Sequence, residues 1–179
     1  MSLLLSTPRL TIAPLGPRDL EPFVAYRRDP VVAQLQSWEP TFSHADASEL
    51  IASQPDDLPA PGGWIQLGLH DARGVLVGDV AIHTLADQPD TYELGVTLAP
   101  AAQGKGLAAE AVAAVIAHLF ASRAAHRVVA SCDARNEAVA RLLRRVGMRR
   151  ESRQVDADWF KEEWTTLDGY AILRREWSR

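Results

Sequence analysis

A glycine-rich turn between a strand and a long helix is the feature that most constrains this chain. The apolar pattern predicts a strand over 92–98 and a helix over about 104–122, and Pro100 ends the strand between them. The turn reads Gln103-Gly104-Lys105-Gly106. The first turn of a helix has unpaired N–H groups and the positive end of the helix dipole, and glycines let an anion approach the backbone closely. The segment therefore predicts a phosphate-binding loop, with a plain strand–helix turn as the alternative.

The loop matches neither of two common nucleotide-binding patterns. The chain has no Gly-x-x-x-x-Gly-Lys-Ser/Thr sequence, which disfavours a nucleotide-hydrolysing P-loop. It also has no Gly-x-Gly-x-x-Gly sequence after a strand, which disfavours a Rossmann dinucleotide site. If the turn binds a diphosphate, we therefore expect a fold other than these two.

The other elements predict a mixed sheet. Strands are expected over 10–14, 64–69, 75–82, 92–98, 127–131 and 170–173, and helices over 17–28, from Ser43 onward, over 104–122 and over 136–146. The strands from 64 to 98 are separated by short turns and form an antiparallel meander. Strand, helix, strand, helix and strand then follow, so we expect an α/β (α+β) fold with helices on both faces of the sheet. The length suits one domain over 1–179.

Composition excludes several functional classes. Lys+Arg 19 against Asp+Glu 23 gives a net charge of −4, so no nucleic-acid partner is expected. The apolar run from 108 to 121 is short and contains Glu110 and His118, so no membrane span is expected. The first residues lack the basic region of a signal peptide. Cys132 is the only cysteine, which excludes an internal disulfide and fits a cytoplasmic location.

The turn also carries a family resemblance. Gln103-Gly104-Lys105-Gly106-Leu107-Ala108 resembles the Gln/Arg-x-x-Gly-x-Gly/Ala signature of the GNAT acetyltransferase superfamily. Thr7-Pro8-Arg9-Leu10, Glu93-Leu94-Gly95 and the helix from Asn136 to Gly147 resemble the branch that acetylates ribosomal-protein N-termini. The resemblance covers nearly the whole chain. It implies the GNAT fold, in which a mostly antiparallel sheet contains one splayed parallel pair of strands.

The resemblance also implies a cosubstrate and the residues that bind it. Acetyl-CoA would lie between the splayed strands, with no metal involved. An N–H near Val96 or Thr97 would polarise the thioester carbonyl. The implied coenzyme-binding residues are Val96, Thr97, Leu98, Gln103, Gly104, Lys105, Gly106, Leu107, Ala108 and Asn136.

Three residues are candidates for the general base that takes the proton of an acceptor amine. Glu93 is the first candidate because its strand would line the acyl site. Asp79 and His83 lie four residues apart on the preceding strand, hence on one face, and are the other two. Each has a structural alternative, a solvated or hydrogen-bonded strand side chain. Tyr92 and Tyr170 are candidate proton donors to the leaving thiolate.

One departure from the family pattern bears on mechanism. Val139 replaces a serine whose hydroxyl would protonate the thiolate, and we expect Val139 to pack on the inner face of its helix. Among the tryptophans, Trp64 is expected in the core, whereas Trp38 and Trp159 are candidate walls of the acceptor site.

The expected reaction is transfer of an acetyl group to a primary amine in a ternary complex, the amine being a protein N-terminus or a small molecule. Two alternatives remain: a non-catalytic acyl-CoA-binding module, and a transferase that uses another acyl-CoA such as succinyl-CoA. A homodimer is an expectation from the family.

Overall fold

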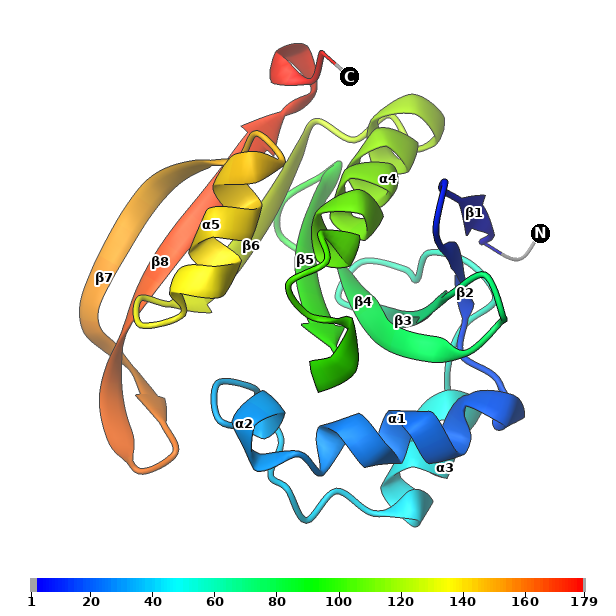
Figure 1. Ribbon diagram of the computed structural model, residues 1–179. Helices are drawn as coiled ribbons and strands as arrows, with labels where there is room; N and C mark the ends of the chain where they lie inside the picture. Colours follow the sequence, from blue (N-terminus) through cyan, green and yellow to red (C-terminus); the bar gives the residue numbers. More distant parts are fainter. Residues whose placement is uncertain (1–2, 179) are drawn as a thin grey trace.

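The computed structural model describes residues 3–178 and contains one eight-stranded sheet (Figure 1). The strand order is β1-β2-β3-β4-β5-β6-β8-β7. Its strands are β1 (Leu5–Ser6), β2 (Thr11–Pro14), β3 (Trp64–His70), β4 (Leu76–Thr84), β5 (Thr91–Leu98), β6 (Arg127–Asp133), β7 (Arg149–Phe160) and β8 (Glu163–Leu173). Neighbouring strands are antiparallel except β5 and β6, which are parallel. The predicted mixed, mostly antiparallel sheet is confirmed.

The parallel pair is short and then splays. β5 and β6 are in register only at Thr91–Arg127, Tyr92–Val128 and Glu93–Val129. From Leu94 onward β5 continues beside β4 alone, while β6 continues beside β8. The sheet therefore opens into a gap directly after Glu93.

The helices form two groups. α4 (Leu107–Ser122) and α5 (Glu137–Arg145) lie along the sheet, and α4 buries Val112, Val115 and Ile116 in the main core. α1 (Leu20–Arg27), α2 (Pro30–Ala33) and α3 (His44–Ala52) form a separate group (Figure 1), whose Phe23 belongs to a second hydrophobic cluster. Helices thus lie on both sides of the sheet, as predicted. None of the helices within residues 3–178 is long and apolar enough to span a membrane.

Local sequence explains where two of these helices begin. The Ser43 hydroxyl accepts the Asp46 N–H at 3.1 Å, and the Asp46 carboxylate accepts the Ser43 N–H at 2.8 Å, so a reciprocal cap starts α3. α4 starts at Leu107, three residues later than predicted. Gly104 and Gly106 have φ of +73° and +77°, which are left-handed conformations that belong to the turn and not to the helix.

The carboxyl-terminal hairpin was underestimated. The sequence predicts a strand only over 170–173, whereas β8 spans 163–173 and pairs with the unpredicted β7. Nine consecutive residues of β7, 149–157, are exposed. Because these residues face solvent, their side chains follow no apolar alternation, and the usual sequence signal of a strand is missing.

Candidate active site

The glycine-rich turn forms an open helix end. The first backbone hydrogen bond of α4 runs from the Glu110 N–H to the Gly106 carbonyl at 3.1 Å, so the N–H groups of residues 107–109 precede the hydrogen-bonded ladder. A Cβ added to Gly104 would meet no atom within 4 Å, so the backbone there borders free space. The Gln103 side-chain amide donates to the Leu98 carbonyl at 3.1 Å and ties the turn to β5. This arrangement suits an anion, as the sequence predicts.

A cavity, here called the splay cavity, occupies the gap between β5 and β6. Residues from both strands, α4, α5 and the segment after α2 line it: Leu35, Gln36, Leu94, Gly95, Val96, Val112, Ala130, Ser131, Cys132, Asp133, Asn136, Val139 and Leu143. Of the predicted coenzyme-binding residues, the structure brings Val96 and Asn136 to this cavity, while residues 103–108 form the turn and the start of α4.

Asn136 and Val139 connect this cavity to α5. The side-chain oxygen Oδ1 of Asn136 accepts the Val139 N–H at 3.1 Å and caps the helix. Within residues 3–178 the side-chain nitrogen Nδ2 of Asn136 makes no hydrogen bond, so it can donate to a molecule in the cavity. Val139 is partly buried and packs against the main core, as predicted.

A second, more open cavity, here called the Glu93 cavity, adjoins the first. Its lining residues come from the ends of β5 and β6 and from the β7–β8 hairpin: Glu93, Arg127, Val129, Ala130, Ser131, Glu151, Ser152, Gly169 and Tyr170. Ala130 and Ser131 border both cavities. The two spaces therefore lie next to each other where the parallel strands separate.

Glu93 is held by two polar side chains at this junction. One carboxylate oxygen lies 3.3 Å from Nδ1 of His83, and the other accepts the Ser131 hydroxyl at 3.2 Å. The Glu93 side chain is 27% exposed, so it is fixed in place yet open to solvent. A carboxylate in this setting can accept a proton directly or through a water molecule. The structure thus brings Glu93 and His83 together.

Trp64 lies on the other side of His83. The two rings are stacked, with centroids 4.4 Å apart and planes 8° from parallel. Trp64 is 48% exposed, so its predicted place in the core is wrong. It occupies the first position of β3 directly opposite His83, where its ring stacks on the imidazole.

Asp79 occupies a different environment from His83. It is buried beneath α1, where it accepts the Tyr26 hydroxyl and lies 3.8 Å from the Arg27 guanidinium. Burial raises the pKa of the Asp79 carboxyl, and the two partners offset this only in part. Asp79 lines neither cavity. Trp38, a predicted wall of the acceptor site, stacks on the same Arg27 guanidinium at 3.9 Å from its ring centroid.

The remaining candidate side chains differ in whether they line one of the two cavities. Tyr170 lines the Glu93 cavity, and its buried hydroxyl has no hydrogen-bond partner within residues 3–178. Tyr92 lines neither cavity. Cys132 lines the splay cavity, but burial raises its pKa to about 11, which disfavours a thiolate nucleophile. Residues 3–178 contain no cluster of three or more His, Cys, Asp or Glu side chains able to hold a metal ion.

Sequence reasoning missed two contacts of this region. Ser131 gives no motif signal, because a serine becomes a partner of Glu93 only through the pairing of β6 with β5. Arg9 contacts the glycine-rich turn by donating to the Lys105 carbonyl at 2.8 Å. The Thr7-Pro8-Arg9 sequence was noticed as a family feature, but its contact spans 96 residues of chain.

Comparisons with known proteins agree with the fold. The acetyltransferase (GNAT) domain family matches residues 9–149. An N-acetyltransferase from Bacillus subtilis (strain 168), YnaD, is 29% identical over 97% of this chain and 99% of its own length. A GNAT-family acetyltransferase structure from Bacillus anthracis superimposes with a TM-score of 0.87 at 25% identity, covering 97% of this chain and 100% of the other.

Two further solved structures share the fold at lower identity. Spermidine N-acetyltransferase from Vibrio cholerae, in complex with coenzyme A and spermine, has a TM-score of 0.81 and 19% identity, covering 95% of this chain and 98% of that one. The ribosomal L7/L12 α-N-protein acetyltransferase RimL, in complex with coenzyme A, has a TM-score of 0.82 and 15% identity, covering 96% and 98%. With a family match over more than half of its length, this chain belongs to the GNAT family and is an N-acetyltransferase.

Proposed function

We propose that the splay cavity holds the pantetheine arm of acetyl-CoA, with the diphosphate on the turn and helix end formed by residues 103–108. Two features of this chain support the placement. Within residues 3–178 the N–H groups of residues 107–109 precede the hydrogen-bonded part of α4, the backbone at Gly104 borders open space, and Lys105 adds a cation. Among residues 3–178 no strand pairs with the part of β5 after Glu93 on its β6 side, so an extended amide-containing arm can pair there as an added strand.

In the proposed reaction an acceptor amine in the Glu93 cavity attacks the thioester carbon. The amine gives a proton to Glu93, a C–N bond forms, and the C–S bond breaks. The coenzyme A thiolate leaves and takes a proton from water or from Tyr170. The single observation that carries this proposal is that Ala130 and Ser131 line both cavities, and that Ser131 also contacts the Glu93 carboxylate.

The acceptor is proposed as a primary amine that approaches from the hairpin side. The Glu93 cavity has the Glu93 carboxylate, which suits an ammonium group before it loses its proton, whereas Glu151 in the same lining is paired with Arg127 and Arg149. Both a small polyamine and a protein N-terminus meet this description, and similar folds carry both activities. Transfer of another acyl group, such as succinyl, and a non-catalytic acyl-CoA-binding role are the alternatives.

A thiol-release assay tests the proposal. Purified protein is incubated with acetyl-CoA or succinyl-CoA and a panel containing spermidine, small monoamines and short peptides with free N-termini. Release of free thiol that depends on the acceptor supports an enzyme, and the best acceptor identifies the class. Binding of acetyl-CoA without release over the whole panel would favour the binding-module alternative.

Assembly and location complete the proposal. We propose a homodimer that forms through the exposed apolar side chains of the β7–β8 hairpin, Val155, Trp159 and Trp164. Sedimentation at several concentrations tests it, and the Trp159→Ser/Trp164→Ser variant should then sediment as a monomer.

The free thiol of Cys132 suits a reducing compartment, so we propose that the enzyme is cytoplasmic.

A further inference from the structure

The glycine-rich turn is clamped from outside by the segment between β1 and β2. Arg9 donates through Nη1 to the Lys105 carbonyl at 2.8 Å and through Nε to the Glu110 carboxylate at 2.7 Å. The Thr7 hydroxyl and the Arg9 backbone N–H donate to the other oxygen of Glu110 at 2.6 and 2.9 Å. The glycine-rich turn, at Lys105, and the first turn of α4, at Glu110, are thereby both held by the Arg9 side chain.

The contacts from Thr7 and Arg9 also compensate the negative charge of Glu110 near the glycine-rich turn. Glu110 lies in the first turn of α4, where an unpaired carboxylate would repel a bound diphosphate. Each of its two oxygens accepts at least one hydrogen bond from Thr7 or Arg9. Its side chain is only 17% exposed, so its charge is compensated locally. The turn keeps a net positive character through Lys105 and the helix end.

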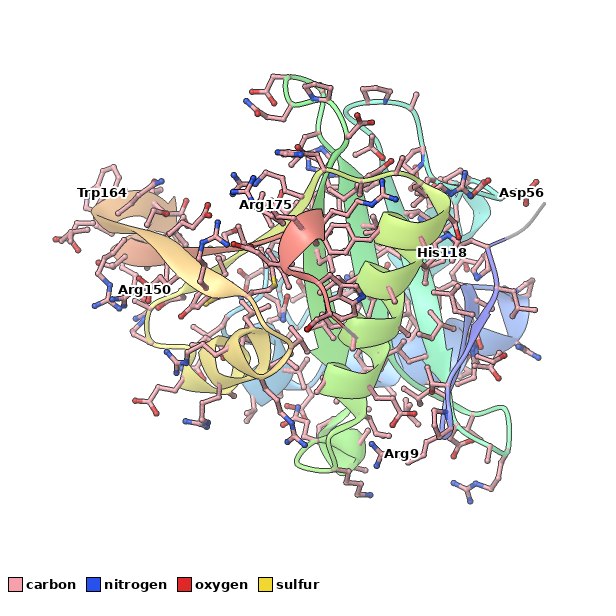
Figure 2. All side chains as sticks on the ribbon, turned by 90° about the horizontal axis from the view of Figure 1, so that it is seen from above. Arg9, Asp56, His118, Arg150, Trp164 and Arg175 are labelled. Carbon is pink, nitrogen blue, oxygen red and sulfur yellow. The ribbon has the colours of Figure 1, made fainter. Side chains whose placement is uncertain are left out.

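One edge of the Arg9 guanidinium remains available for a ligand. Nη2 makes no hydrogen bond within residues 3–178, although Nε and Nη1 are both engaged. Nη2 is also the atom nearest to a Cβ built on Gly106, at 3.6 Å. The Arg9 side chain is 49% exposed, and Figure 2 shows it beside the amino-terminal turn of α4. A guanidinium fixed by two of its nitrogens presents the third with little loss of side-chain freedom.

We infer that Arg9 is a further coenzyme-binding residue, whose Nη2 donates to a diphosphate oxygen while Nε and Nη1 hold the turn in place. The inference rests on the proposed function, because it requires that the diphosphate of coenzyme A lies on the turn. It adds to the site a residue that is 95 positions before Gly104 in the chain. The acceptor and the reacting thioester take no part in it.

Calorimetric titration with coenzyme A tests the inference directly. Loss of a charge-assisted hydrogen bond is expected to raise the Kd of Arg9→Ala by roughly 10- to 100-fold, with Arg9→Lys in between. Arg149→Ala is the matched control. Arg149 has a similar exposure of 45% and also pairs with carboxylates, but it lies on β7, and its variant should bind as the unmodified protein does.

A double variant separates direct binding from mere shielding of Glu110. If Arg9 only neutralises Glu110, Arg9→Ala/Glu110→Gln should regain the affinity of the unmodified protein. If Arg9 contacts the diphosphate, the double variant should stay about as weak as Arg9→Ala, and its Kd should depend less on salt. Full recovery in the double variant would overturn the inference.

A truncated cosubstrate provides the kinetic readout. Acetyl-pantetheine lacks the diphosphate, so Arg9→Ala should leave its kcat/KM unchanged while raising the KM for acetyl-CoA with little change in kcat. An equal loss with both cosubstrates would show that Arg9 is structural. If the unmodified protein fails to bind coenzyme A at all, the proposed function fails instead, so the two failures are distinguishable.

Discussion

The Glu93 carboxylate and the His83 imidazole face each other across β5 and β4, with 3.3 Å between their nearest atoms. Register pairing places the two residues directly opposite, so backbone hydrogen bonds of the sheet set their separation. Trp64 then limits where the imidazole can turn. A carboxylate positioned in this way keeps one orientation while the acceptor binds.

Replacing Glu93 should therefore impair catalysis and leave coenzyme binding intact. For Glu93→Gln we expect kcat to fall roughly 10²- to 10⁴-fold, the usual contribution of general-base catalysis. The loss of rate toward acidic pH should also flatten. Steady-state kinetics across pH with the best acceptor measures both. The control is Glu49→Gln, which removes an exposed carboxylate on α3. If the pH–rate profile of Glu93→Gln is identical to that of Glu49→Gln, Glu93 is not the base and His83 is the next candidate.

Gly106→Val should abolish tight coenzyme A binding without unfolding the protein. Gly106 has φ of +77°, so a side chain there costs about 1–2 kcal/mol in strain and projects toward Arg9 Nη2. Gly74→Val is the matched control, because Gly74 has φ of +76° in the β3–β4 turn with nothing within 4 Å. Thermal unfolding should show similar losses for both variants. Calorimetry should show lost affinity only for Gly106→Val, and unchanged affinity there would place the diphosphate elsewhere.

Val139→Ser should not increase the rate. Val139 packs partly against the core beside the splay cavity, so a serine there loses apolar contact and should cost about 1 kcal/mol in the free energy of unfolding. Denaturant unfolding and kcat measured on the same preparation give both quantities. Val75→Ser, at an exposed valine, should change stability by less than about 0.5 kcal/mol. A rate gain in Val139→Ser would show that a hydroxyl at this position protonates the thiolate.

Glu110 should contribute a pH-dependent part of the stability. Burial raises the pKa of its carboxyl, but bonds from Thr7 and Arg9 outweigh this and leave the pKa below its ordinary value of 4.5. The unfolded chain therefore binds this proton more readily than the folded chain, and the stabilisation is present above pH 4.5 and lost as the pH falls through the lowered value. The stability gap between the unmodified protein and Glu110→Gln should narrow on acidification. A gap that stays constant from pH 7 to about 3 would contradict this assignment.

Local sequence patterns were enough to predict the meander, the turn before α4 and the cap of α3. Each depends on residues close together in the chain: alternation in 75–82, the pair Gly104 and Gly106, and the reciprocal bonds of Ser43 and Asp46. The splay of β5 and β6 was expected only from the family resemblance. No local pattern states how far two parallel strands stay paired.

The features that escaped prediction depend on distant contacts. β7 carries no alternating apolar signal because its residues 149–157 are exposed on an arm. Asp79 and His83 were grouped by strand periodicity, yet α1 covers Asp79 and leaves His83 beside Trp64. Periodicity assigns a face of the sheet, and only the packing of a remote helix decides which part of that face stays open.

The short contact between β5 and β6 also has a mechanical consequence. Three register pairs of β5 and β6 join the first five strands of the sheet (β1–β5) to the last three (β6, β8 and β7). The sheet therefore consists of two parts with a short connection between them. A molecule that pairs with β5 beyond Glu93 adds backbone hydrogen bonds where β5 and β6 are no longer paired, and it thereby limits the motion of one part of the sheet relative to the other. Amide hydrogens of residues 94–98 should then exchange more slowly with solvent, and protection should spread into β6 although no atom of the ligand need touch most of it.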